Sequence, residues 1–329
     1  MIFQHAHEII TDDIFVRLDE LVPGSESFLK IEGWNPAGSI KLKSAVGMIE
    51  DAERRGLLWA GGRIIESSSG SLGIALAIVA AGKGYRFTCV TDPNISPQSL
   101  ALIRALGADV IQVDRRDANG GFLGTRIARI QRELAADPKL IWLNQYANPS
   151  NPDAHARSTA TSILRHIGRV DQLFVGAGTT GTLMGCIRHF RAFSPTTKIV
   201  AVDTAGSVTF GHPPGPRHIP GLGTSRRPEL CRPEAVDEVV LVPEADAIRM
   251  CRRLAAERGL PVGGSTGSVV AAVERSAALI PPGSRVVALS PDTADRYIHT
   301  VYDDEWVART YGPETLSRIH GGDTCPVPA

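Results

Sequence analysis

The sequence lacks the features that mark several specialised classes of protein. Its 329 residues hold 35 Lys and Arg against 35 Asp and Glu, so no net charge draws the chain to nucleic acid or to an anionic membrane. The five cysteines form no C-x-x-C pair, which argues for reduced thiols in a cytoplasmic protein. The longest apolar run, residues 74–81, is far too short to span a bilayer.

Other absences narrow the chemistry further. The nine histidines include no H-E-x-x-H and have no cysteine partners, so no metal site is expected. Residues 1–13 lack the basic, apolar and small-residue order of a signal peptide, and no internal repeat is evident. Residues 321–329 are mostly Gly, Pro and small residues, and we expect a disordered tail there. A globular protein of one large or two ordinary domains fits this composition.

Short apolar runs alternate with helical patterns along the chain. Strands are predicted at 28–31, 63–66, 87–91, 110–113, 141–144, 172–175, 198–202, 238–241 and 285–289. Helices are predicted at 72–81, 97–106, 121–136, 153–167, 182–193, 244–258 and 268–279, with a further helix that reaches residue 53. The alternation indicates an α/β fold with doubly wound, mostly parallel sheets, in which ligands bind at the loops that follow strands.

The loop at residues 35–41 reads N-P-A-G-S-I-K and leads from a strand into a helix. It places Lys41 in the first helical turn, where the helix dipole disfavours an ammonium. A lysine that gives up its proton readily can form a Schiff base with an aldehyde. The alternative is an ordinary lysine on a solvated helix face, and this segment alone favours that alternative.

Two further loops have the composition of anion sites. Residues 67–73, S-S-S-G-S-L-G, place hydroxyls and backbone N–H groups at a helix start, although a simple N-cap would also explain one serine. Residues 176–182, G-A-G-T-T-G-T, offer a phosphate cradle between a strand and a helix. This second loop also fits G-x-G-x-x-G, with Asp203 at the end of a later strand, so a nicotinamide-dependent dehydrogenase stays open at this point.

A fourth loop, residues 263–268, reads G-G-S-T-G-S before a predicted helix. A tight turn with an N-cap explains the pattern. Its Ser265 hydroxyl would also suit a heteroaromatic nitrogen, because a hydroxyl can donate to that nitrogen without forcing its protonation.

The four loops together suit pyridoxal 5'-phosphate (PLP), whose aldehyde, phosphate and ring nitrogen need an amine, a cradle and a polar partner. In order and spacing they resemble the N-P-x-x-S-x-K, S-G-N-x-G, G-T-G-G-T and G-x-S-S-G motifs of fold-type II PLP enzymes, the cysteine synthase and cystathionine β-synthase family. The resemblance covers nearly the whole chain. It implies a tryptophan-synthase-β-like fold with a smaller mobile domain at 35–148, a larger cofactor-binding domain made of 1–34 and 149–329, and a homodimer.

The resemblance also implies roles for individual residues. Lys41 would be the Schiff-base lysine, and Ser265 would face the pyridine nitrogen. The phosphate would be held by Gly178, Thr179, Thr180, Gly181 and Thr182. The substrate carboxylate would be cradled by Ser67, Ser68, Ser69 and Gly70, with Gln145 nearby. Arg126 and Tyr146 are candidates for binding the leaving phosphate or the carboxylates of a second substrate.

Within the family, the segments 92–97, 120–128, 144–148, 201–208 and 295–297 resemble the branch that makes N-(2-amino-2-carboxyethyl)-L-glutamate. That branch implies β-replacement on O-phospho-L-serine with L-glutamate as amine nucleophile, giving a 2,3-diaminopropionate precursor for siderophore or antibiotic synthesis. The alternatives are a cysteine synthase that uses sulfide with O-acetylserine or O-phosphoserine, the dehydrogenase named above, and a non-catalytic binding module.

Two positions depart from the family pattern. Ser71 stands where the family has an asparagine that hydrogen-bonds the cofactor ring oxygen, so this contact is expected to be weaker or to run through water. Lys43 stands where the family has an arginine, two residues from Lys41, and is a rival amine. Because a helix turns about 200° over two residues, both amines cannot face one ring, and the motif register selects Lys41.

Overall fold

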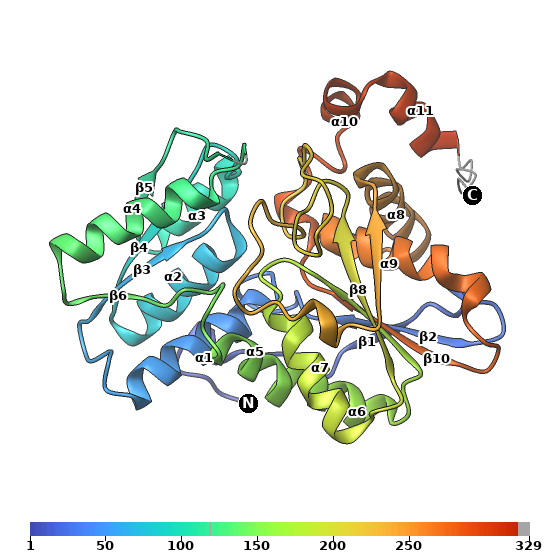
Figure 1. Cartoon of the computed structure of the whole chain (residues 1–329), viewed down its shortest axis with the longest axis horizontal. Coiled ribbons are helices and arrows are strands. Elements are labelled where there is room, and N and C mark those ends of the chain that lie inside the picture. The colour runs from blue at the N-terminus through green and yellow to red at the C-terminus, as the bar shows by residue number, and fades with distance from the viewer. Residues whose placement is uncertain (119, 322–329) are drawn as a thin grey trace.

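The computed structural model describes residues 1–118 and 120–321, and the chain forms two β-sheets side by side, each covered by helices (Figure 1). The four-stranded sheet has the order β5-β4-β3-β6 and is parallel throughout. The six-stranded sheet has the order β1-β2-β10-β7-β8-β9 and is parallel except for the antiparallel pair β1–β2. The predicted α/β class with mostly parallel sheets is confirmed.

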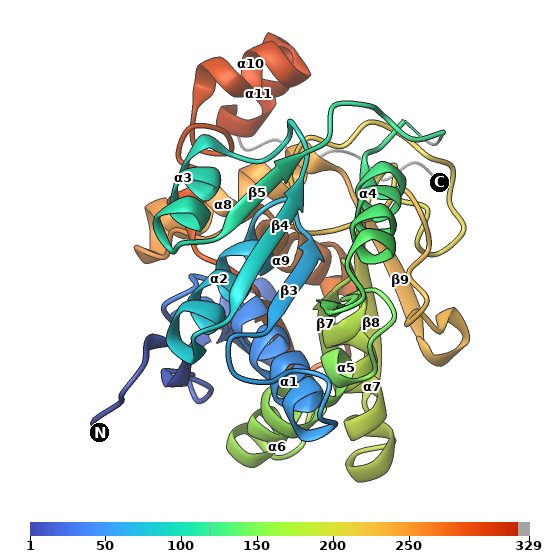
Figure 2. The ribbon, with the colours of Figure 1, turned by 90° about the vertical axis from the view of Figure 1, so that its left-hand side faces the viewer.

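The four-stranded sheet is buried on both faces, as Figure 2 shows with this sheet turned toward the viewer. Its elements are β3 (Arg63–Ser67), α2 (Ser71–Lys83), β4 (Arg86–Thr91), α3 (Pro97–Ala105), β5 (Asp109–Gln112), α4 (Leu123–Ala136) and β6 (Leu140–Trp142). Successive β3 residues face opposite sides, so Ile64 packs with the cluster under α2 and α3 while Ile65 packs with Ile130 of α4. This two-sided burial explains why the strands read as continuous apolar runs.

The six-stranded sheet follows the same rule on a larger scale. Its elements are β1 (Phe15–Arg17), β2 (Glu26–Ile31), α5 (Ser150–His155), α6 (Thr161–Ile167), β7 (Gln172–Gly176), α7 (Gly181–Phe193), β8 (Lys198–Thr204), β9 (Glu238–Val242), α8 (Glu244–Arg258), α9 (Gly264–Ser276) and β10 (Arg285–Ser290). Phe174 packs toward α8 and α9, whereas its neighbours Leu173 and Val175 pack toward α6 and α7. The chain then adds α10 (Asp304–Tyr311) and α11 (Pro313–Gly321) beside α8.

Helix α1 (Lys41–Arg54) lies between the two halves and packs against both α2 and α5. Leu42, Met48 and Ile49 are fully buried on this helix. The approach to α5 is close, because a Cβ at Gly47 would lie 2.7 Å from the Cβ of Ala154. Helix α1 thus packs on two sides, and its first residue, Lys41, lies between the two sheets.

The nine predicted strands are all present, with ends shifted by no more than a few residues. Three features differ from the prediction. The predicted helix at 153–167 is interrupted by a π-helical turn at Ala156–Ala160, β1 and the last two helices were not predicted, and α9 begins at Gly264 rather than 268. Ser265 therefore lies inside the first turn of α9, not in a loop before it. Of the tail predicted at 321–329, Gly321 ends α11 and the rest lies outside the described residues.

The four-stranded sheet falls within residues 35–148, for which a separate mobile domain is predicted. That boundary and its mobility stay a prediction. Across the described part of the chain, every helix is too short or too polar to cross a membrane.

Candidate active site

A cavity of about 660 Å³ opens where the carboxyl ends of both sheets meet. Its wall is formed by the loops that follow β3, β4, β6, β7 and β10, by the start of α1 and by the long segment after β8. This is the edge of a parallel sheet at which ligands are expected to bind. Every sequence-predicted site residue lines this cavity except Ser67.

Lys41 is the first residue of α1 and lines the cavity. The preceding loop is fixed by Asn35, whose side-chain amide donates to the carbonyls of Glu32 (2.8 Å) and Ser39 (3.0 Å) and accepts from the Ala37 N–H (2.9 Å). Burial lowers the pKa of Lys41, with the Asp292 carboxylate opposing this shift and Arg296 adding to it. A lysine with a lowered pKa supplies the neutral amine that Schiff-base chemistry needs.

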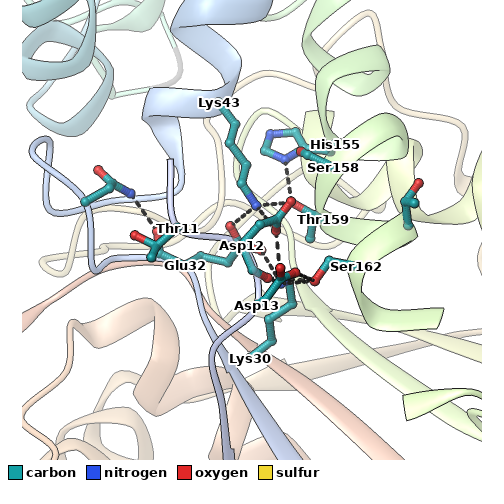
Figure 3. A network of polar contacts seen from close by, with 12 residues as sticks. Thr11, Asp12, Asp13, Lys30, Glu32, Lys43, His155, Ser158, Thr159 and Ser162 are labelled. Carbon is teal, nitrogen blue, oxygen red and sulfur yellow. Dashed lines mark hydrogen bonds and ion pairs between the residues drawn. The ribbon is translucent and has the colours of Figure 1, made fainter. Parts of the chain in front are cut away.

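Lys43, the rival amine, points away from the cavity into a buried polar network (Figure 3). Its Nζ lies 2.5 Å from Asp12 Oδ1 and 2.5 Å from Glu32 Oε2, and it donates to Thr159 Oγ1 at 3.0 Å. These two carboxylates raise the pKa of Lys43 against the effect of its burial. Lys43 is therefore held as an ammonium, which is not a nucleophile.

The glycine-rich loop between β7 and α7 packs so closely against its neighbours that two of its glycines leave no space for a side chain. A Cβ at Gly178 would lie 2.5 Å from the carbonyl oxygen of Gly221, and a Cβ at Gly181 would collide with Asn151. Thr180 adopts a left-handed conformation with φ of 65°, and α7 begins at Gly181. The buried Thr180 Oγ1 and Asn151 Oδ1 have no hydrogen-bond partner among the described residues. The loop thus presents a helix N-terminus and an unused hydroxyl to the cavity, the pattern of an anion cradle.

Ser265 belongs to a buried triad that the sequence analysis missed. Its Oγ donates to Asp292 Oδ1 at 2.8 Å, and the Tyr297 hydroxyl donates to Asp292 Oδ2 at 2.5 Å. Since the Ser265 hydrogen is directed to Asp292, the lone pairs of Ser265 are left for a donor in the cavity. Asp292 lies two residues after the end of β10, so the rule that ligands bind after strands could have pointed to it.

The serine-rich loop, residues 67–73, contains both a helix cap and part of the cavity wall, which are the two roles considered for it from sequence. Ser68 Oγ accepts the N–H groups of Gly70 (3.1 Å) and Gly73 (2.8 Å), so it caps α2 while it also lines the cavity. Ser69, Gly70 and Ser71 line the cavity as well. Ser67 is fully buried at the end of β3, and its carbonyl accepts from Gln145 Nε2 at 2.7 Å. Ser67 thereby orients Gln145, which does line the cavity.

Two arginines and an aspartate lie in the cavity wall near Tyr146. Arg126 of α4 is buried, lies 3.3 Å through its Nε from Asp92 Oδ2, and contacts Tyr146. Arg217, in the long segment after β8, was not predicted; its Nε has no hydrogen-bond partner within residues 1–118 and 120–321. Its only signal in sequence is a cation within a Gly- and Pro-rich segment. This part of the cavity suits an anionic substrate group.

The chain belongs to the pyridoxal-phosphate-dependent enzyme family, whose model matches residues 10–292. It is 45% identical over 312 residues to an N-(2-amino-2-carboxyethyl)-L-glutamate synthase of Ralstonia nicotianae, with 94% of this chain and 92% of that protein covered. Among solved structures it is similar to O-ureido-L-serine synthase (34% identity, TM-score 0.85, 94% and 100% covered). It is also similar to an O-acetylserine-dependent cystathionine β-synthase from Helicobacter pylori (28% identity, TM-score 0.84, 91% and 98% covered).

The residues present fit the PLP that this family uses. Lys41 offers an amine with a lowered pKa, the 176–182 loop offers a cradle with an unpartnered Thr180 hydroxyl, and Ser265 offers lone pairs. Asp203, which a dinucleotide site would need at its ribose, is buried with Oδ1 bonded to the Thr204 N–H and does not line the cavity. PLP as cofactor and a PLP-dependent enzyme are thereby confirmed, and the dehydrogenase alternative is wrong.

Proposed function

We propose that this enzyme replaces the phosphate of O-phospho-L-serine by the amine of L-glutamate. The C–O bond to phosphate breaks and a C–N bond forms, giving N-(2-amino-2-carboxyethyl)-L-glutamate and inorganic phosphate. One observation carries the proposal: a single cavity combines the Lys41 amine, an anion cradle and the arginines 126 and 217. The 45% identity to a synthase of that product supports it.

The proposed roles divide the cavity between cofactor and substrates. PLP held there would supply an electron sink for the α-carbon of the serine donor, the chemistry that allows its β-substituent to leave. Lys41 Nζ holds the cofactor aldehyde between turnovers, then takes the α-proton of the serine donor and returns it to the product. The loop 178–182 holds the cofactor phosphate, and Ser71 lies at the place of the family asparagine.

At the ring nitrogen, we assign Ser265 the contact and Asp292 the orientation of its hydroxyl. The Ser265 hydroxyl donates to Asp292 at 2.8 Å, so Ser265 acts here as an acceptor from a protonated ring nitrogen, whereas the sequence suggested a donor to an unprotonated one. Tyr297 and Arg296, the latter 3.7 Å from Asp292, hold this carboxylate in place.

The substrates are held by neutral hydrogen-bond donors on one side of the cavity and by guanidinium groups on the other. Ser68, Ser69, Gly70 and Gln145 receive the α-carboxylate of the serine donor at the start of α2. Arg126 and Tyr146 receive the departing phosphate or a glutamate carboxylate, and Arg217 adds a second guanidinium to this region. Two guanidinium groups in one cavity favour two substrates that carry oxyanions, in contrast to sulfide, which carries no carboxylate for an arginine to bind.

Mass analysis of the products tests the proposal against cysteine synthase. The purified enzyme is incubated with phosphoserine or acetylserine, each with glutamate or sulfide. We expect the glutamate adduct with phosphoserine as the faster donor. Cysteine formed rapidly from either donor, without any glutamate adduct, would contradict the proposal.

We further propose that the enzyme acts in the cytoplasm as a homodimer and supplies 2,3-diaminopropionate for siderophore or antibiotic synthesis. All four cysteines in the described residues are buried free thiols, which suits a reducing compartment. Light scattering on the purified protein measures the oligomeric state, and a monomer at micromolar concentration would contradict the dimer.

A further inference from the structure

A chain of buried hydrogen bonds connects Lys43 to the glycine-rich loop. Lys43 Nζ donates to Thr159 Oγ1 at 3.0 Å, and Thr159 Oγ1 lies 3.3 Å from His155 Nδ1 (Figure 3). On the other side of the ring, His155 Nε2 lies 3.0 Å from Ser44 Oγ and 3.3 Å from Thr182 Oγ1. Lys43, Thr159 and His155 are all buried, whereas Thr182 lines the cavity.

The direction of these bonds follows from Lys43. An ammonium can only donate, so Thr159 Oγ1 accepts from it and has its own hydrogen left for His155 Nδ1. A neutral His155 that accepts at Nδ1 carries its single hydrogen on Nε2 and shares it between Ser44 Oγ at 3.0 Å and Thr182 Oγ1 at 3.3 Å. Burial, with Lys43 and Lys41 as further causes, lowers the pKa of His155 well below its usual value, which keeps the ring neutral. Thr182 Oγ1 then accepts from His155, and its own hydrogen is free to point into the cavity.

We propose that Lys43, Thr159 and His155 are positioning residues that orient the Thr182 hydroxyl as a donor to the cofactor phosphate. This inference rests on the proposed assignment of the 178–182 loop to that phosphate. The inference also assigns a role to Lys43, which stands where the family has an arginine. Asp12 and Glu32 hold its charge, and its third contact, with Thr159, begins the relay of hydrogen bonds from Lys43 through Thr159 and His155 to Thr182.

The test compares two ligands on the same cofactor-free full-length protein. PLP and pyridoxal share the aldehyde and ring, but only PLP carries a phosphate. Absorbance titration gives the affinity ratio of PLP to pyridoxal for each variant. A general loss of stability weakens both ligands alike and cancels in the ratio, whereas a misdirected Thr182 hydroxyl lowers the ratio alone.

Thr159→Val removes the relay hydroxyl with little change of shape. Because an oriented hydrogen bond to a charged group contributes measurably, we expect the ratio to fall about 3- to 10-fold, and about 10-fold or more in Thr182→Val. Ser162→Ala is the matched control: Ser162 accepts from Lys30 at 3.0 Å at the other end of the network and does not contact His155. Its ratio should equal that of the wild type even if its melting temperature falls.

A second pair covers the case in which Thr159→Val does not fold. His155→Gln keeps an N–H donor near the Nε2 position and should retain most of the ratio, whereas His155→Phe should lose it. An unchanged ratio in Thr159→Val, or equal ratios in the two His155 variants, would overturn the relay. A wild type that binds pyridoxal as tightly as PLP would overturn the loop assignment, and the relay with it.

Discussion

At the residue scale, Arg217 places in the cavity wall a guanidinium that makes few hydrogen bonds to the described residues. Arg217 belongs to a segment of Gly and Pro residues, yet its guanidinium faces the same space as Arg126 and Tyr146. It donates to the Leu222 carbonyl only at 3.4 Å, which leaves most of its hydrogen-bonding capacity for a substrate.

Arg217→Gln should therefore raise KM for phosphoserine or for glutamate by about 10- to 100-fold, the range for a hydrogen bond to a charged group. Steady-state kinetics with each substrate varied in turn identifies which oxyanion Arg217 binds. Arg226→Gln, which removes an exposed ion pair with Glu229 in the same segment, is the control and should leave both values near wild type. Unchanged KM for both substrates in Arg217→Gln would remove Arg217 from the site.

His155 should make the protein sensitive to acid. Its folded pKa lies well below 6.5 because of burial and of Lys43 and Lys41, whereas the unfolded chain takes up a proton near 6.5. Below that pH the unfolded state binds more protons, so this group's contribution to stability is present above pH 6.5 and is lost by about 1.4 kcal/mol per unit as the pH falls. Urea unfolding at pH 5, 6 and 7 should show a smaller decline in His155→Gln. Parallel curves for the two proteins would contradict this assignment.

At the element scale, the extended N-terminal segment before β1 is tied to the core through Asp12. Asp12 accepts from Lys43 and Lys30, and its backbone carbonyl also accepts from Lys30 and Ser162. Asp12→Asn leaves two buried ammonium groups with Glu32 as the remaining carboxylate, so we expect a loss of about 3 kcal/mol of unfolding free energy. Asp13→Asn is the neighbouring control, because Asp13 is half exposed and pairs with exposed Arg165; it should cost less than 1 kcal/mol. Equal effects in urea unfolding would refute the special position of Asp12.

The predicted elements are marked by local sequence patterns, whereas the missed ones depend on tertiary pairing or close packing. Strands β3, β4, β7, β8 and β10 are buried on both faces, so their apolar runs identify them without tertiary information. Strand β1 has three residues and exists through its antiparallel pairing with β2. The start of α9 was placed too late because Gly264 and Gly267 look like loop residues. They are instead required by close packing, since a Cβ at Gly264 would collide with Ile219 and one at Gly267 with the Ala247 carbonyl.

The site residues also divide into those that the sequence could locate and those that required the fold. The four motif loops all follow strands or begin helices, so sequence order alone located Lys41 and the 176–182 loop at the cavity. The bond between Ser265 and Asp292 joins residues 27 positions apart on different elements, and no sequence pattern encodes it. The direction of Lys43 was inferred from helix geometry, but its partners Asp12 and Glu32 come from other elements and required the fold.

At the scale of the whole molecule, the cavity lies between two separately packed sheets that share α1. The serine-rich loop and Arg126 belong to the half with the four-stranded sheet, whereas the glycine-rich loop 176–182 and Ser265 belong to the other half. We propose that residues 35–148 move toward the larger part when substrate binds, which would bring the carboxylate loop onto the substrate.

Hydrogen exchange of the PLP-loaded enzyme tests this closure. Adding phosphoserine should slow exchange in residues 68–72 and 94–99, which line the cavity from the smaller half, while residues 168–172, at the opposite end of β7 from the cavity, serve as the internal control. Uniform protection across all three segments, or none, would contradict a movement of this half.

The central claim is that this cavity binds PLP through Lys41. Borohydride reduction of the enzyme as purified, followed by digestion and mass spectrometry, fixes the cofactor to the amine that holds it. We expect a phosphopyridoxyl group on Lys41, no modification of Lys43, and loss of the label in Lys41→Ala. A label on Lys43, or an unlabelled enzyme that still forms product, would contradict it.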